Sequence, residues 1–185
     1  MPVRDMTKEA LLNAFGGESM AHMRYLIFAE IAEREGYANV ARLFKAIAYA
    51  ELVHARNHYS VLREYKEPAP VYSGTPIGPG NTSKNLELAY MGEEHEVNEM
   101  YPVYLEIARF QSESQAVRSF HFALEAEKIH AKLYREAKNY VDKGQDWPLQ
   151  GKVWICPVCG HTHVGTEPPE RCPVCGASRD KYQGF

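Results

Sequence analysis

Two short motifs in the chain each pair a glutamate with a histidine three residues later, Glu51 with His54 and Glu127 with His130. On an α-helix, side chains at this spacing share one face, with Cβ atoms about 5–6 Å apart, so both can reach the same ion. A single motif of this kind is usually a solvated surface pair. Two copies, joined by carboxylates from two more helices, are typical of helix bundles that hold two iron or manganese ions.

A further carboxylate, Glu18, lies in a stretch with helical periodicity. Its neighbours on that side, Met20, Met23 and Leu26, are apolar, so we expect Glu18 to face the core. An unpaired buried carboxylate would be strongly destabilising, which favours a cation as its partner. The segment 92–96 (Gly-Glu-Glu-His-Glu) supplies the acidic groups of another helix.

The two halves of the helical region resemble each other at a fixed offset. Residues 25–32 match residues 101–108, and residues 50–55 match residues 126–131, each at an offset of 76. The repeated unit is a pair of long helices, so the pattern predicts a duplicated hairpin with the two Glu-x-x-His motifs at pseudo-symmetric places. The other histidines, which have no repeated carboxylate partner, are expected to be surface or hydrogen-bonded structural residues: His22, His58, His95 and His121.

The repeat leaves the acidic ligand of the third helix ambiguous. An offset of 76 between the two halves aligns Glu18 with Glu94, whereas an offset of 75 aligns it with Glu93. One extra residue between Glu93 and Tyr101 could be absorbed by a π-bulge, a feature that often occurs at functional sites. This arithmetic alone does not choose between the two glutamates.

All four cysteines lie near the C-terminus in two Cys-Pro-Val-Cys-Gly sequences, Cys156/Cys159 and Cys172/Cys175. This spacing is typical of a tetrahedral four-thiolate metal site. Zinc would make the site a structural ribbon, and iron would make it a one-electron carrier. The companion carboxylate site favours iron, with zinc as a substitute, because a redox centre needs an electron donor.

Four helices must position the carboxylates and histidines. We expect them at about residues 7–35, 39–65, 83–110 and 113–142. Thr7 and a capping box at residues 112–115 should begin the first and last helices. Residues 66–84 hold four prolines and three glycines and cannot be helical. Extended, they reach about 60 Å, enough to run along a bundle or cross into a neighbouring subunit.

Length and composition agree with a helical domain plus a small module. The chain has 185 residues, 45% hydrophobic and 24% charged, with a net charge of −3. We expect a bundle at 1–143, a linker at 144–150 and a cysteine module at 151–185. The charge gives no basic footprint for nucleic acid. No apolar run is long enough to span a membrane, and the N-terminus has no signal-peptide layout, so we expect a cytoplasmic protein.

These motifs together resemble the rubrerythrin family over nearly the whole chain. The segments that carry the resemblance are residues 17–25, 50–54, 92–102, 126–130 and the tail 156–182. The resemblance implies an all-α, ferritin-like four-helix bundle with a di-iron centre, followed by a rubredoxin-like module with one iron on Cys156, Cys159, Cys172 and Cys175.

The resemblance also implies roles for individual residues. The implied iron ligands are Glu18, Glu51, His54, Glu93, Glu96, Glu127 and His130. Glu51 and Glu127 would bridge the two irons, whereas Glu96 and His54 would be alternative ligands of one iron. Tyr25 and Tyr101 would donate hydrogen bonds to ligand carboxylates.

The implied activity is that of a peroxidase that reduces hydrogen peroxide to water in defence against oxidative stress. Electrons would come from an external rubredoxin or NAD(P)H-dependent reductase, since the chain has no Gly-x-Gly-x-x-Gly motif of its own. We expect a homodimer or higher homo-oligomer, with or without swapped helices. The alternatives are a ferritin-like ferroxidase or iron-handling protein, and a non-enzymatic zinc-binding module.

Overall fold

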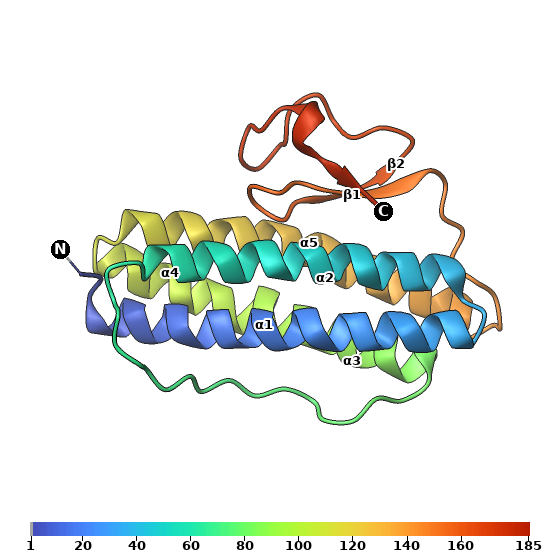
Figure 1. Cartoon of the computed structure of the whole chain (residues 1–185), viewed down its shortest axis with the longest axis horizontal. Helices are drawn as coiled ribbons and strands as arrows, with labels where there is room; N and C mark the ends of the chain where they lie inside the picture. Colours follow the sequence, from blue (N-terminus) through green and yellow to red (C-terminus); the bar gives the residue numbers. More distant parts are fainter. Residues whose placement is uncertain (1) are drawn as a thin grey trace.

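The computed structural model describes residues 2–185, a bundle of four helical rods with a small β module packed on one side (Figure 1). The rods are α1 (Asp5–Arg34), α2 (Ala38–Val61), the composite of α3 (Thr82–His95), the π-helix η1 (Glu96–Met100) and α4 (Tyr101–Phe110), and α5 (Ser114–Val141). The prediction of a four-helix bundle followed by a small cysteine-bearing module is therefore confirmed.

Short turns make antiparallel hairpins of α1 with α2 and of α4 with α5. Gly36 has a φ of 86°, and the N–H of Tyr37 donates to Ala32 O at 2.8 Å, which ends α1. Both capping predictions are wrong. Ser112 has a φ of 61° and lies in the turn, and Thr7 lies inside α1, where its hydroxyl donates to Gln111 Oε1 at 2.7 Å.

The long crossover between α2 and α3 runs along the outside of its own bundle (Figure 1). Ser73 Oγ donates to Asn13 O at 2.5 Å, and the Val71 side chain lies so close to Gly16 that a β-carbon there would collide with it. The crossover therefore contacts α1 on its way between the two ends of the bundle, and α3 begins with Asn81 accepting from Lys84 N at 2.9 Å.

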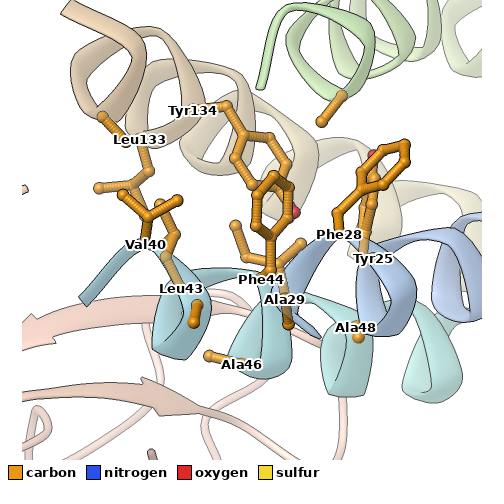
Figure 2. Close-up of a cluster of buried hydrophobic side chains, with 14 of the residues drawn as sticks. Tyr25, Phe28, Ala29, Val40, Leu43, Phe44, Ala46, Ala48, Leu133 and Tyr134 are labelled. Carbon is orange, nitrogen blue, oxygen red and sulfur yellow. The ribbon is translucent and has the colours of Figure 1, made fainter. Parts of the chain in front are cut away.

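The bundle core combines small residues on α1 with large aromatic residues. Tyr25, Phe28, Phe44 and Tyr134 form one aromatic cluster in the core drawn in Figure 2. The expected apolar surroundings of Glu18 on α1 are partly wrong, because Met23 is 55% exposed, as is the nearby Ile27 at 45%. The face that carries Glu18 is instead lined by alanines and Tyr25, since small side chains allow α1 to approach α2 closely.

The C-terminal module is a three-stranded antiparallel sheet with the order β2-β1-β3: β1 (Lys152–Ile155), β2 (Thr162–Gly165) and β3 (Gln183–Gly184). A 3₁₀ turn, η2 (Arg179–Lys181), precedes β3. The linker is anchored as well, since Asp146 accepts from Asn39 N at 2.8 Å and Val40 N at 3.2 Å at the start of α2. Within residues 2–185, we find no helix with the length and apolar character needed to cross a membrane.

Candidate metal centres

The centre of the bundle brings together six of the seven bundle residues that were expected to bind metal. They come from all four rods and are no more than 1% exposed: Glu18, Glu51, His54, Glu93, Glu127 and His130. They form two overlapping groups, within each of which the ligand atoms lie within 4.8 Å of one another. One group contains Glu18 and His54, the other contains Glu93 and His130, and both contain Glu51 and Glu127.

The two shared glutamates lie between the two histidines. His54 Nδ1 is 2.7 Å from Glu127 Oε1 and 3.0 Å from Glu51 Oε2. His130 Nδ1 is 2.6 Å from Glu127 Oε2 and 3.4 Å from Glu51 Oε1. Each shared carboxylate thus turns one oxygen toward each histidine, which is the arrangement a carboxylate needs to bridge two ions.

The site contains more buried carboxylate oxygens than its own hydrogen-bond donors satisfy. Glu18 Oε2 and Glu93 Oε2 are buried without a hydrogen-bond partner, and Glu127 Oε1 and Glu51 Oε1 each face only one imidazole nitrogen. Buried carboxylate oxygens without partners are costly, and the two imidazole rings offer fewer donors than the four carboxylates can accept. The donor set of carboxylate oxygen and imidazole nitrogen suits iron or manganese, so the residues present fit a pair of such ions.

The buried charges shift one another's pKa values. Burial raises the pKa of Glu51 to about 7, helped by the charges of Glu127 and Glu18. Burial and the same kind of repulsion, from Glu127 and Glu51, hold the pKa of Glu93 well above its usual range. Burial alone would lower the pKa of His54, but the carboxylates of Glu127 and Glu18 outweigh it and raise that pKa. Burial alone would raise the pKa of Glu18, but His54 outweighs it and keeps Glu18 ionised.

Glu96, the seventh expected ligand, belongs to neither group. It is the first residue of η1 and is half-buried. Burial and the charge of Glu18 raise its pKa well above the usual range. The π-helix lies between Glu93 and Tyr101, where the extra residue was expected, and it leaves Glu93 facing the core while Glu94 accepts from Asn98 Nδ2 at 3.3 Å.

Two tyrosines hold the carboxylates that are not shared. Tyr25 donates to Glu93 Oε1 at 2.7 Å, and Tyr101 donates to Glu18 Oε1. Each tyrosine therefore serves a glutamate from the other half of the repeat. Partners of this kind orient a ligand and tune its basicity.

The buried His58 has a closer relation to the site than the sequence indicated. Its Nε2 is 3.0 Å from Tyr101 Oη, and its Nδ1 is 2.8 Å from Ser119 Oγ. Burial lowers the pKa of His58, which favours its neutral form. The signal that could have found it is the repeat itself, because the offset of 76 places His58 on the buried Tyr134.

The four cysteines form a second cluster, with their sulfurs within 4.8 Å of one another. Cys156 Sγ lies 3.6 Å from Cys175 Sγ, and Cys159 Sγ lies 3.4 Å from Cys172 Sγ. Two equivalent turns hold the cysteines. The N–H of Gly160 donates to Cys156 O and the N–H of Gly176 donates to Cys172 O, each at 2.9 Å. Four sulfurs at one point fit a tetrahedral iron or zinc ion.

The cysteine module packs directly on the two clustered histidines, His54 and His130. Gly160, which closes the first cysteine turn, lies against His54 Nε2, and Thr162 Oγ1 is 2.8 Å from His130 Nε2. Asn57 on α2 donates to Val158 O at 2.9 Å, which fixes the same turn. Both histidines therefore turn Nδ1 toward the carboxylates and Nε2 toward the module.

Comparison with known proteins agrees with this geometry. Residues 9–138 match the rubrerythrin family model, and residues 154–183 match the model of the rubredoxin-like domain of rubrerythrin. The chain belongs to the rubrerythrin family. It is 53% identical over 180 residues to rubrerythrin-2 of Clostridium acetobutylicum, with 97% of each chain covered. It is 36% identical to nigerythrin of Nitratidesulfovibrio vulgaris over 97% of this chain and 86% of that one.

A solved structure shows the same overall arrangement. The fully reduced, all-ferrous state of nigerythrin matches with a TM-score of 0.85 and 34% identity, over 100% of this chain and 89% of that one. Rubrerythrins are in general peroxide-reducing proteins with a di-iron site and a rubredoxin-like four-cysteine site. Both kinds of cluster are present in this member of the family.

Proposed function

We propose that this protein is a non-haem di-iron peroxidase that reduces hydrogen peroxide to water with electrons delivered through its four-cysteine iron site. The observation that carries the proposal is the orientation of the two histidines. Their Nδ1 atoms face a cluster of buried carboxylates, and their Nε2 atoms face the cysteine module. A redox site and its electron donor would thus be adjacent within one chain.

The proposed iron ligands in the bundle are Glu18, Glu51, His54, Glu93, Glu96, Glu127 and His130. Two ferrous ions together would supply the two electrons that cleave the O–O bond, so one peroxide, two electrons and two protons give two waters. Glu51 and Glu127 would bridge. Glu96 and His54 would be alternative ligands of one iron, since a carboxylate suits ferric iron and a neutral imidazole suits ferrous iron.

The protein's own residues would keep this site organised and dry. Tyr25 and Tyr101 hold the carboxylates of Glu93 and Glu18 in place. The surrounding alanines and aromatic rings exclude water, which strengthens electrostatic interactions inside the site. A rigid, preorganised site reduces the cost of reorganising charge during the reaction.

The proposed route for electrons is the contact between the first cysteine turn and His54. Iron held by Cys156, Cys159, Cys172 and Cys175 would return electrons one at a time. The external donor would be a rubredoxin or an NAD(P)H-dependent reductase. We further propose a cytoplasmic location and a role in defence against oxidative stress. We also propose a homodimer or higher homo-oligomer, with or without helices swapped between subunits through the long crossover.

Metal analysis and steady-state kinetics test the proposal together. The purified protein should contain three irons per chain, should show the visible charge-transfer absorption of an iron–thiolate site, and should consume hydrogen peroxide when an NAD(P)H-dependent reductase is present. Oxidation of added Fe²⁺ by O₂ without peroxide turnover would instead favour a ferroxidase. A colourless protein with zinc on the cysteines would contradict the electron-transfer half of the proposal.

A further inference from the structure

Each ligand-holding tyrosine lies in an aromatic cluster, and the repeat of 76 residues matches the two clusters member by member. Tyr25, Phe28 and Phe44 correspond to Tyr101, Tyr104 and Phe120. The ring centroids of Tyr25 and Phe44 are 6.0 Å apart, as are those of Tyr101 and Phe120. Phe28 and Phe44 are 5.6 Å apart, and Tyr104 and Phe120 are 5.5 Å apart. The ring spacings around the two tyrosines are therefore alike, although the angles between the rings differ: Tyr25 and Phe28 lie at 41°, whereas Tyr101 and Tyr104 lie at 89°.

The fourth member of each cluster breaks this similarity. Tyr134 lies 5.2 Å from Phe44, and its repeat partner His58 lies 5.4 Å from Phe120. The hydroxyl of Tyr134 is buried without a hydrogen-bond partner in the described chain. His58 instead has a partner at both ring nitrogens, Tyr101 and Ser119. One half of the site thus has a polar link where the other half has only ring packing.

The hydrogen bond at the Glu18 end of this link fixes the direction of the others. The Tyr101 hydroxyl donates its proton to Glu18 Oε1. The oxygen of Tyr101 is then left to accept from His58 Nε2–H. In the neutral ring Nδ1 carries a lone pair, which accepts the hydroxyl proton of Ser119. The chain runs in one direction, from Ser119 through His58 and Tyr101 to Glu18.

We propose that His58, held by Ser119, is a positioning residue that fixes the Tyr101 hydroxyl on Glu18, so that the half of the metal centre containing Glu18 and His54 is better organised for a cation than the half containing Glu93 and His130. This inference rests on the proposed metal centre. It adds to the centre a second asymmetry, besides the extra proposed ligand Glu96.

Titration of the metal-free full chain with manganese(II) tests the asymmetry. Mn²⁺ prefers carboxylate and imidazole to thiolate ligands, so it reports on the bundle site, and its free ion is measured by electron paramagnetic resonance. The wild-type chain should bind two ions. His58→Phe keeps a ring in the cluster and removes both hydrogen bonds. It should weaken one of the two binding constants about tenfold, which is about 1.4 kcal/mol, and leave the other within about twofold.

Two further variants separate positioning from packing. Tyr134→Phe is the matched control, because it removes the unpartnered hydroxyl at the repeat-related place, and it should leave both binding constants unchanged. His58→Gln retains an N–H donor and should recover most of the lost affinity. The inference is overturned if His58→Phe leaves both constants unchanged, or if Tyr134→Phe weakens binding as much as His58→Phe does.

A measurement without metal in the bundle distinguishes failure of this inference from failure of the proposed function. With zinc on the cysteines, the ¹⁵N resonances of His58 should show its proton on Nε2, and Ser119→Ala should weaken that preference. A proton on Nδ1 would overturn the positioning role. A wild-type chain that binds no pair of ions, but still shows His58 protonated on Nε2, would refute the metal centre and leave the link between His58 and Tyr101 standing.

Discussion

Gly160 lies against Nε2 of His54, so closely that a β-carbon on Gly160 would collide with the imidazole ring. The residue belongs to the turn that closes the first pair of cysteines, and its φ of 82° suits glycine. The other nitrogen of the same ring lies 2.7 Å from Glu127. One imidazole thus joins the four-cysteine cluster to the carboxylate cluster.

Replacing Gly160 with alanine should therefore disturb the junction between the two clusters. The new methyl group must displace either the module or His54. We expect electron transfer from the cysteine iron to the bundle to slow by about tenfold or more, because small displacements of reacting groups have large effects on rate. Stopped-flow mixing of the fully reduced protein with hydrogen peroxide measures this rate, because the visible absorption of the thiolate iron returns as its electron passes to the bundle.

Gly176 provides a matched control for that experiment. It closes the second cysteine turn with a φ of 76°, but a β-carbon there would contact nothing within 4 Å. Gly176→Ala should lower stability by about 1–2 kcal/mol, the cost of a left-handed backbone, and leave the transfer rate near normal. Equal slowing in both variants would show that the contact with His54 is not the relevant feature.

Removal of the Tyr25 hydroxyl should weaken metal binding without unfolding the bundle. Tyr25 donates to Glu93 Oε1 at 2.7 Å, and loss of such a partner lowers metal affinity by about 10–100-fold. Competition with a chelator measures the affinity of Tyr25→Phe. Tyr134→Phe, in the neighbouring ring, has no such bond to lose and should behave as the wild type. Wild-type affinity in Tyr25→Phe would contradict the assigned role of this hydroxyl.

The metal-free protein should become less stable as the pH rises from about 5.5 to 8. The pKa of Glu51 is raised from 4.5 to about 7, so between these values the folded chain binds more protons than the unfolded chain, and the free energy of unfolding falls with pH. The raised pKa of His54 acts in the same direction, since the stability it contributes is lost as pH rises through its folded pKa. The lowered pKa values of Glu18 and Glu127 matter only below about pH 4.5.

Thermal unfolding of the metal-free chain at several pH values measures this effect. The loss should be on the order of 2 kcal/mol, or about 4–8 °C in Tm. Glu51→Gln removes one of the titrating groups and should make the fall in stability with pH less steep. Bound metal displaces the proton, so the loaded protein should not follow the same trend. A Tm that stays constant or rises between pH 5.5 and 8 in the metal-free wild type would contradict the assignment.

The Cys159→Ser variant should separate peroxide reduction from electron delivery. Loss of one thiolate disrupts the iron site on the cysteines, but Cys159 does not contribute to the carboxylate cluster. Chemically pre-reduced protein should still consume one equivalent of peroxide, whereas steady-state turnover with a reductase should be lost. Normal steady-state turnover in this variant would show that electrons enter the bundle by another route.

Much of the bundle site was predictable because its information is local and repeated. The Glu-x-x-His spacing and the offset of 76 indicated which side chains could share a helix face, and the mismatch at Glu93 indicated the extra residue that η1 accommodates. The inward face of α1 was not predicted correctly. Alanines line that face, whereas the bulkier Met23 and Ile27 are exposed, so hydrophobic size alone misled the assignment.

The remaining features depend on contacts that no sequence pattern encodes. Nothing in the spacing of Gly160 or Thr162 indicates that the cysteine module packs on His54 and His130. His58 lacks a carboxylate partner at helical spacing, and its role depends on Tyr101 and Ser119, which lie 43 and 61 residues away along the chain. Tertiary packing alone brings these groups together.

The central claim is that the bundle holds two iron ions beside a third on the cysteines. A crystal structure of the iron-loaded protein, with anomalous scattering measured at the iron absorption edge, tests it most directly. We expect three anomalous peaks per chain, with one at the centre of the four sulfurs and a close pair among Glu18, Glu51, His54, Glu93, Glu127 and His130. A bundle without paired peaks, or carboxylates that point away from a common centre, would contradict it.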